Sequence, residues 1–141
     1  MISQNGKKRI LVIDDDIEIR QFLKAALTSE GWGVQEAANG KEALDYLNQN
    51  PPGTYSLIFL DMQMPILDGW RFLPLYRQYQ QELKNDSKAP VIVMTAAMTI
   101  SRYANQIQAD DYLPKPFDLT NLLSILKKHL SFPYNSLSVT S

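Results

Sequence analysis

The sequence predicts one α/β domain in which helices cover both faces of a parallel sheet. Three short apolar runs rich in β-branched residues predict strands buried on both faces, at Arg9–Ile13, Ser56–Leu60 and Pro90–Met94. Segments with apolar residues at helical spacing alternate with these runs, and this alternation is typical of parallel sheets. The length of 141 residues suits a single domain, since most domains hold about 100–150 residues.

The first half of the chain continues this pattern. A helix is expected between Arg9–Ile13 and Gly31, which is a plausible helix end. Its apolar face comprises Ile19, Phe22, Leu23, Ala26 and Leu27. Gly33–Ala37 is a weaker segment and a candidate edge strand, and Asn39 is placed to cap a short helix. The apolar side of that helix comprises Ala43, Leu44 and Leu47.

The second half is expected to hold three more helices and two more strands. Pro74 lies inside the helical pattern of Trp70, Leu73 and Tyr76, so that helix is expected to be kinked or to begin later. Met98–Gln108 predicts a short helix and Asp111–Leu113 a short strand. Asp118 is expected to cap the last helix. The apolar face of this helix comprises Leu119, Leu122, Leu123, Leu126 and Leu130.

No linker followed by a second folded segment is visible in the sequence. We expect a lead-in over residues 1–7, one domain over residues 8–130 and a flexible tail over residues 131–141. The initial Met1 and the polar tail favour a complete chain.

Composition excludes several classes of protein. The chain has no cysteine and one histidine, His129, which excludes disulfides, thiolate metal sites and multi-histidine metal sites. Fourteen Lys and Arg residues against fifteen Asp and Glu residues argue against a nucleic-acid binder. No apolar run approaches the roughly 18–20 residues that span a membrane, and residues 1–9 lack the apolar core of a signal peptide. We therefore expect a cytoplasmic protein that binds neither nucleic acid nor membrane.

Polar residues follow the predicted strands and carry the candidate chemistry. Asp14–Asp16 follow the first strand, Asp61 the third, Thr95 the fourth, and Lys115 comes after the fifth. Ligands of open α/β sheets bind at the carboxyl ends of the strands, so these side chains should converge. Carboxylates about 4 Å apart repel by roughly 4 kcal/mol per pair at an effective dielectric near 20, which one lysine cannot offset. Oxygen ligands without His or Cys favour Mg²⁺, or Mn²⁺ in its place.

Five short motifs, in this order, resemble those of response-regulator receiver domains, the CheY-like family of two-component signalling. They are Ile-Asp-Asp at 13–15, Leu-Asp-Met-Gln-Met-Pro at 60–65, Asp-Gly at 68–69, Met-Thr-Ala at 94–96 and Lys-Pro-Phe at 115–117. The resemblance covers about residues 8–130. It implies a (βα)5 fold of the flavodoxin and CheY-like type, doubly wound, with a five-stranded parallel sheet in the order 2-1-3-4-5.

The resemblance also implies a role for each acidic residue. Asp61 matches the phosphoacceptor, a carboxylate that takes a phosphoryl group from a phosphohistidine or a small phosphodonor. Asp14 and Asp15 match the acid pair that binds Mg²⁺, with Asp61 and the backbone carbonyl of Gln63 as further ligands. The Gln63 side chain should tune the lifetime of the phosphorylated state. Lys115 matches the lysine that pairs with Asp61 and later with a phosphoryl oxygen.

Two further residues match the conformational switch of the family. The Thr95 hydroxyl would bond the phosphoryl group, and the Tyr112 ring would then turn inward, although Tyr112 could also be ordinary packing. Pro116 matches the proline whose peptide bond with Lys115 is cis. The chain departs from the family between Thr95 and Tyr112, where the interval is shorter and Gln108-Ala109 replaces the usual Gly-Ala. This puts the partner surface near the fourth helix in question.

The first functional hypothesis is a stand-alone response regulator. A histidine kinase or histidine phosphotransfer protein would phosphorylate Asp61, and the domain would signal to an unidentified downstream protein as a monomer or weak homodimer. It would promote only its own phosphorylation and dephosphorylation, so we expect no enzyme activity on a separate substrate.

Three alternatives remain open from the residues. One is a phosphorylation-independent interaction module on the same fold. An FMN binder of the flavodoxin type should have a phosphate loop rich in Gly, Ser and Thr where this chain has Asp14–Asp16. A phosphatase of the haloacid dehalogenase kind should have an acid at position 63, where this chain has glutamine.

Overall fold

The computed structural model describes residues 8–130, so the expected lead-in and tail lie outside the described part of the chain. Five parallel strands form one sheet in the order β2-β1-β3-β4-β5, which confirms the predicted topology. The strands are β1 (Arg9–Ile13), β2 (Gly33–Ala37), β3 (Tyr55–Asp61), β4 (Val91–Met94) and β5 (Asp111–Tyr112). The helices are α1 (Ile17–Ser29), α2 (Gly40–Gln49), α3 (Gly69–Gln81), α4 (Ala97–Tyr103) and α5 (Leu119–His129).

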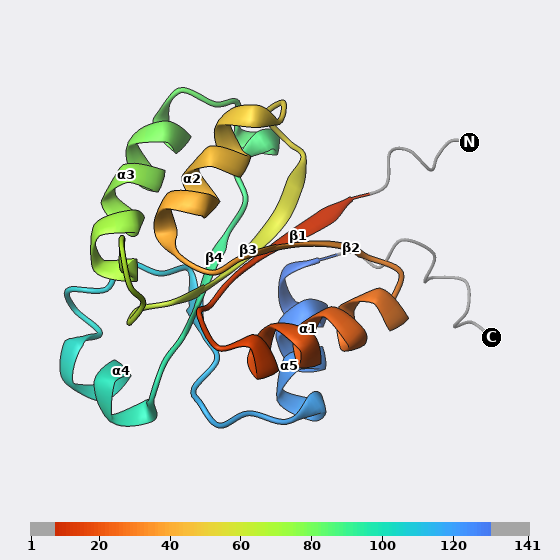
Figure 1. Ribbon diagram of the computed structural model, residues 1–141, viewed down its shortest axis with the longest axis vertical. Coiled ribbons are helices and arrows are strands. Elements are labelled where there is room, and N and C mark those ends of the chain that lie inside the picture. The colour runs from red at the N-terminus through yellow and green to blue at the C-terminus, as the bar shows by residue number, and fades with distance from the viewer. Residues whose placement is uncertain (1–7, 131–141) are drawn as a thin grey trace.

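The sheet separates two apolar layers. Figure 1 shows α2 and α3 on one face of the sheet and α1 and α5 on the other. Alternate residues of β1 enter different layers: Leu11 packs with the side chains of α2 and α3, and Ile10 with those of α1 and α5. Burial on both faces explains why the central strands are continuous apolar runs instead of alternating polar and apolar residues.

Four helices begin with a side-chain cap near the carboxyl edge of the sheet. Asp16, Asn39, Asp68 and Asp118 each accept a hydrogen bond from a backbone N–H in the first turn of their helix. Each bond satisfies a donor that the helix itself leaves free. The expected caps at Asn39 and Asp118 are therefore present, and Asp16 caps α1.

Several boundaries differ from the expected ones. Helix α3 begins at Gly69, so the expectation of a later start was wrong, and Pro74 is accommodated within the helix. Helix α4 ends at Tyr103 instead of Gln108 and has no buried residue, so no apolar face holds a longer helix in place. A short 3₁₀ turn, η1 (Asn85–Ser87), lies in the connector before β4. Among residues 8–130, no helix combines the length and the apolar character needed to cross a bilayer.

Gly69 couples the start of α3 to the end of β3 by close backbone contact. A Cβ atom at this position would lie 2.6 Å from the carbonyl oxygen of Asp61 and 2.7 Å from Cα of Met62. We predict that Gly69→Ala lowers the free energy of unfolding by about 1–3 kcal/mol, as overpacking does, although alanine is the better helix former. Urea denaturation measures the change.

Gly33→Ala is the matched control. Its Cβ would meet chiefly the flexible Arg9 side chain, with Cγ at 3.0 Å. The free energy of unfolding should stay the same or rise by up to about 1 kcal/mol, since glycine is unfavourable in strands. Equal stability of Gly69→Ala and the wild type would show that the contact at Asp61 is not tight.

Candidate functional site

The acidic residues meet because β1 and β3 are neighbours in parallel register. Ile13 pairs with Leu60, so Asp14 and Asp61 leave the sheet side by side. Asp61 also pairs with Met94 of β4, and this places Thr95 at the same edge. Asp14, Asp61 and Thr95 are all buried there. The predicted convergence of these residues at the carboxyl edge is therefore what the fold produces.

Three carboxylates form a compact cluster at this edge. Asp14, Asp15 and Asp61 each offer an oxygen, and these oxygens lie within 4.8 Å of one another. The Gln63 backbone lies beside them, because its N–H donates to Oδ1 of Asp61 at 3.5 Å. An all-oxygen set with several negative charges suits a hard divalent cation such as Mg²⁺. The residues present thus fit the expected metal.

Lys115 provides the positive charge of the cluster. Its Nζ lies 2.8 Å from Oδ2 of Asp14 and 3.6 Å from Oδ1 of Asp61. The lysine therefore bridges both buried acids and lies nearer to Asp14, whereas the expectation named Asp61 alone. Its backbone N–H donates to the Thr95 carbonyl at 2.8 Å. The Lys115–Pro116 peptide bond is cis.

Burial and charge shift the proton affinities of this group. Burial, followed by the negative charge of Asp14, raises the pKa of Asp61 from 3.8 to about 6, against the opposing effect of Lys115. For Lys115, burial alone would lower the pKa, but the hydrogen bond to Asp14 and the charges of Asp14 and Asp61 outweigh it and raise the pKa. The three carboxylates carry more negative charge than the Lys115 ammonium can balance. A bound cation would reduce that excess.

Tyr112 lies farther from the acids than Thr95 does. It pairs with Val93 in the register of β4 and β5 and packs, half-buried, against the apolar layer on the α2 and α3 side. Its hydroxyl donates to the carbonyl oxygen of Ile107 at 2.9 Å. The tyrosine thus ties β5 to the segment that follows the short α4.

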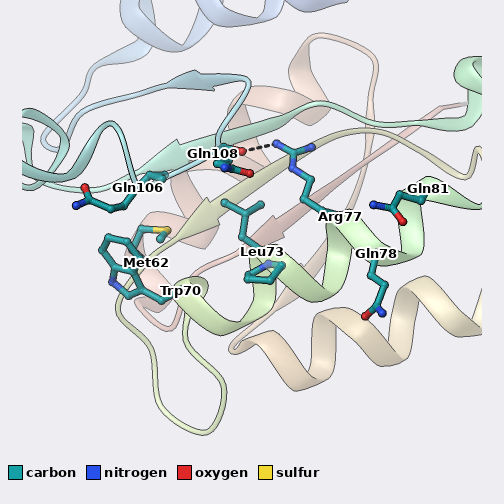
Figure 2. A pocket seen from close by; sticks show the side chains of 10 residues that line it. Met62, Trp70, Leu73, Arg77, Gln78, Gln81, Gln106 and Gln108 are labelled. Atoms are coloured by element: carbon teal, nitrogen blue, oxygen red, sulfur yellow. Dashed lines mark hydrogen bonds between the residues drawn. The ribbon is translucent and has the colours of Figure 1, made fainter.

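A groove of about 430 Å³ flanks the acidic cluster but does not contain it. Figure 2 shows it between α3 and the segment that precedes β5, with Trp70, Arg77 and Gln106 among its lining side chains. Arg77 crosses it to donate to the carbonyl oxygen of Gln108. Its lining includes amides, an arginine and apolar side chains but no carboxylate, so it is separate from the cation site.

Two sets of polar contacts escaped the sequence analysis, one at this edge and one at the start of β5, toward the opposite end of the sheet. Arg20 donates from Nη1 to the Asp14 carbonyl at 2.8 Å and from Nε to Glu36 at 3.0 Å. Asp111 accepts hydrogen bonds from His129 at 2.8 Å and Lys128 at 3.0 Å. Arg20 follows the helix cap by four residues, where one helical turn returns to the cap, and this spacing was its only signal in the sequence.

The raised pKa of Asp61 has a consequence for stability. A carboxyl group whose pKa is higher in the folded state than in the unfolded state disfavours folding above the folded pKa, and the penalty vanishes below the unfolded pKa. We predict that Asp61→Asn, in EDTA, raises the free energy of unfolding by about 2–3 kcal/mol at pH 7.5, with the gain falling between pH 6 and pH 4.

Denaturation in urea at several pH values measures this profile. Asp16→Asn is the matched control, because Asp16 is exposed and asparagine caps helices equally well. A pH-independent effect of Asp61→Asn would show that the Asp61 carboxyl is not perturbed in the folded protein.

Comparison with known proteins identifies a family for this chain. The sequence model of the response regulator receiver domain matches residues 10–127. The probable transcriptional regulator ycf27 of Porphyra purpurea is 40% identical over 116 residues, which cover 81% of this chain and 44% of that protein. This chain spans about half the length of the curated relatives it matches first.

Solved structures show the same fold. The chemotaxis response regulator CheY4 of Vibrio cholerae superposes with a TM-score of 0.74 at 28% identity, covering 88% of this chain and 99% of that one. The response regulator TrrA of Thermotoga maritima, solved with Mg²⁺-BeF, superposes with a TM-score of 0.70 at 33% identity, covering 87% of this chain and 99% of that one. With the family match over nearly all described residues, the chain belongs to the response regulator receiver domains of two-component systems and has their CheY-like fold.

Proposed function

We propose that this receiver domain accepts a phosphoryl group on Asp61 from a phosphohistidine of a histidine kinase or histidine phosphotransfer protein. The observation that carries the proposal is the position of Asp61. Its carboxylate ends β3, shares a cluster with Asp14 and Asp15, and has the Lys115 ammonium at 3.6 Å. A nucleophile, a cation site and a fixed positive charge therefore occupy one edge of the sheet.

The chemical step follows from these groups. An oxygen of Asp61 attacks phosphorus, the new P–O bond forms as the P–N bond of the donor breaks, and the departing imidazole takes a proton from water. The Lys115 ammonium lies 2.8 Å from Asp14 and 3.6 Å from Asp61. It can form an ion pair with the phosphoryl oxygens once the group is bonded to Asp61. Positioning and electrostatic stabilisation thus supply the catalysis, as in phosphoryl transfer generally.

Asp14, Asp15, Asp61 and the Gln63 backbone would hold Mg²⁺ or Mn²⁺. When bound, the cation neutralises charge that develops on the transferring group. The similar protein TrrA, solved with Mg²⁺-BeF, supports this assignment. Only the ionised form of Asp61 is a nucleophile, and cation binding favours that form because it lowers the pKa that burial and Asp14 raise.

We further propose that Thr95 and Tyr112 transmit the modification. A hydrogen bond from the Thr95 hydroxyl to the phosphoryl group would draw the residue toward Asp61. Tyr112, whose hydroxyl is bonded to the Ile107 carbonyl, would then shift the segment between α4 and β5. The output is a changed surface for a downstream protein, and the domain turns over no separate substrate.

We propose that the receiver domain itself acts as a monomer or weak homodimer. The curated relatives that match it are about twice as long, and the ycf27 relative is described as a probable transcriptional regulator. A regulator that acts through an attached domain would share every feature of the site.

We predict a gain of one phosphoryl mass when the protein is incubated with acetyl phosphate or phosphoramidate and Mg²⁺. Intact-mass spectrometry measures the adduct. It should be absent in EDTA and absent in Asp61→Asn, because both the cation and the nucleophile are needed.

Asp16→Asn serves as the matched control, since this exposed carboxylate caps α1 and lies outside the cluster. It should be phosphorylated like the wild type. If neither donor modifies the folded protein, the domain is a phosphorylation-independent interaction module. An adduct that survives Asp61→Asn would assign the chemistry to another residue.

The switch has its own test. Mg²⁺ and beryllofluoride added to the wild type should move the backbone amide resonances of Ile107 and Tyr112 in NMR spectra. We predict that Thr95→Val still binds beryllofluoride at Asp61 but loses these shifts, because the hydroxyl that links the two sites is gone. Unchanged shifts in Thr95→Val would show that the signal leaves Asp61 by another route.

A further inference from the structure

Arg20 joins three elements behind the acidic cluster. Its side chain, on α1, is only 16% exposed. Nη1 donates to the backbone carbonyl of Asp14 at 2.8 Å, and Nε donates to Oε1 of Glu36 on β2 at 3.0 Å. The planar fork of a guanidinium satisfies two acceptors at once with little loss of freedom. Arg20 therefore fastens the loop after β1 to both α1 and the edge strand.

On the loop after β1, Arg20 bonds to a backbone carbonyl, that of Asp14, and not to a side chain. The bond therefore acts on the course of the backbone. The Asp14 carbonyl and the Asp15 N–H belong to one planar peptide unit, so fixing the carbonyl fixes the backbone from which the Asp15 side chain extends. Among residues 8–130, no side-chain hydrogen bond holds the exposed Asp15 carboxylate, whereas Asp14 is held by the Asp16 N–H and by Lys115. The direction of Asp15 thus depends on its backbone.

The edge strand contributes a second backbone contact to the same unit. The Asp14 N–H donates to the carbonyl oxygen of Ala37, next to Glu36, at 3.0 Å. Both sides of Asp14 are therefore tied to the end of β2, one directly and one through Arg20. Loss of Arg20 leaves the N–H contact in place but frees the carbonyl and the peptide unit that leads into Asp15.

We propose that Arg20, locked by Glu36, is a positioning residue that orients Asp15 toward a divalent cation held with Asp14 and Asp61. The inference rests on the proposed cation site and adds a residue that does not touch the cation. Groups that orient metal ligands from behind are often worth about 10–100-fold in metal affinity.

An electrostatic role and a positioning role of Arg20 predict opposite changes in cation affinity when Arg20 is removed. A positive charge close to a cation site repels the cation, so its removal alone would tighten binding. If Arg20 acts by orienting the loop, removal weakens binding instead. The sign of the change therefore separates the two roles without any assumption about its size.

The experiment measures Mg²⁺ binding to the full chain by isothermal titration calorimetry. We expect Arg20→Met to weaken binding about tenfold. Arg20→Lys keeps the charge but offers one ammonium in place of the fork, and it should also weaken binding. Glu36→Gln frees the guanidinium and should give a smaller loss of the same sign. The backbone amide resonance of Asp15 in metal-free NMR spectra should move in all three variants.

Lys24→Met is the matched control. Lys24 also approaches Glu36, at 3.7 Å, and is 58% exposed, but it makes no hydrogen bond to the Asp14 carbonyl. Its removal takes away a similar charge and should leave Mg²⁺ affinity within about twofold of the wild type. Circular dichroism checks that each variant folds, and Arg20→Lys and Glu36→Gln keep the test decisive if Arg20→Met does not fold.

Unchanged or tighter Mg²⁺ binding in Arg20→Met would overturn the proposal, as would wild-type affinity in Arg20→Lys with a loss only in Arg20→Met. Absence of Mg²⁺ binding in the wild type would overturn it together with the cation site. Weaker binding in the Arg20 variants, in a wild type that binds Mg²⁺ but takes no phosphoryl group, would uphold the positioning role and defeat the proposed phosphorylation.

Discussion

The mutual repulsion of three carboxylates is the constraint on which this domain depends. Asp14, Asp15 and Asp61 present oxygens within 4.8 Å of one another, and two of the residues are buried. Water cannot disperse that charge as it would at an exposed surface, and Lys115 carries only one positive charge. The fold must therefore hold together a group of residues that would separate if they were free to do so. A divalent cation is the natural complement to such a site. Burial, followed by the negative charge of Asp14, raises the pKa of Asp61 to about 6.

The scaffold meets this constraint mainly through backbone contacts. The register of β1 and β3 fixes Asp14 beside Asp61, and the bond from the Lys115 N–H to the Thr95 carbonyl sets the approach of the lysine. Gly69 allows α3 to start against the Asp61 carbonyl. Arg20 holds the loop after β1 through its hydrogen bond to the Asp14 carbonyl. The acids are thus held at the rim by backbone contacts, while α4 has no buried residue.

The features that sequence could predict are those that depend on local pattern. Continuous apolar runs indicated the buried strands, capping residues indicated where α2 and α5 begin, and the strand ends indicated that Asp14, Asp61 and Thr95 would meet. The end of α4 could not be predicted, because helical spacing between Met98 and Gln108 does not say whether a neighbour will bury that face, and the helix that forms, Ala97–Tyr103, has no buried residue. Arg20 was missed for a related reason. Its two partners lie on a loop and on an edge strand, and only tertiary structure brings them together. The closer pairing of Lys115 with Asp14 likewise depends on side-chain geometry.

The central claim is that the three carboxylates at this edge repel one another and that a bound divalent cation relieves the repulsion. The most direct measurement is the titration of the Asp61 carboxyl carbon by NMR, with and without Mg²⁺. The account predicts a pKa of about 6 for Asp61 in the metal-free protein, and a clear fall when Mg²⁺ is added. Titration near the ordinary value of 3.8 in both conditions would contradict it, because Asp61 would then be neither perturbed by burial and the charge of Asp14 nor coupled to a cation.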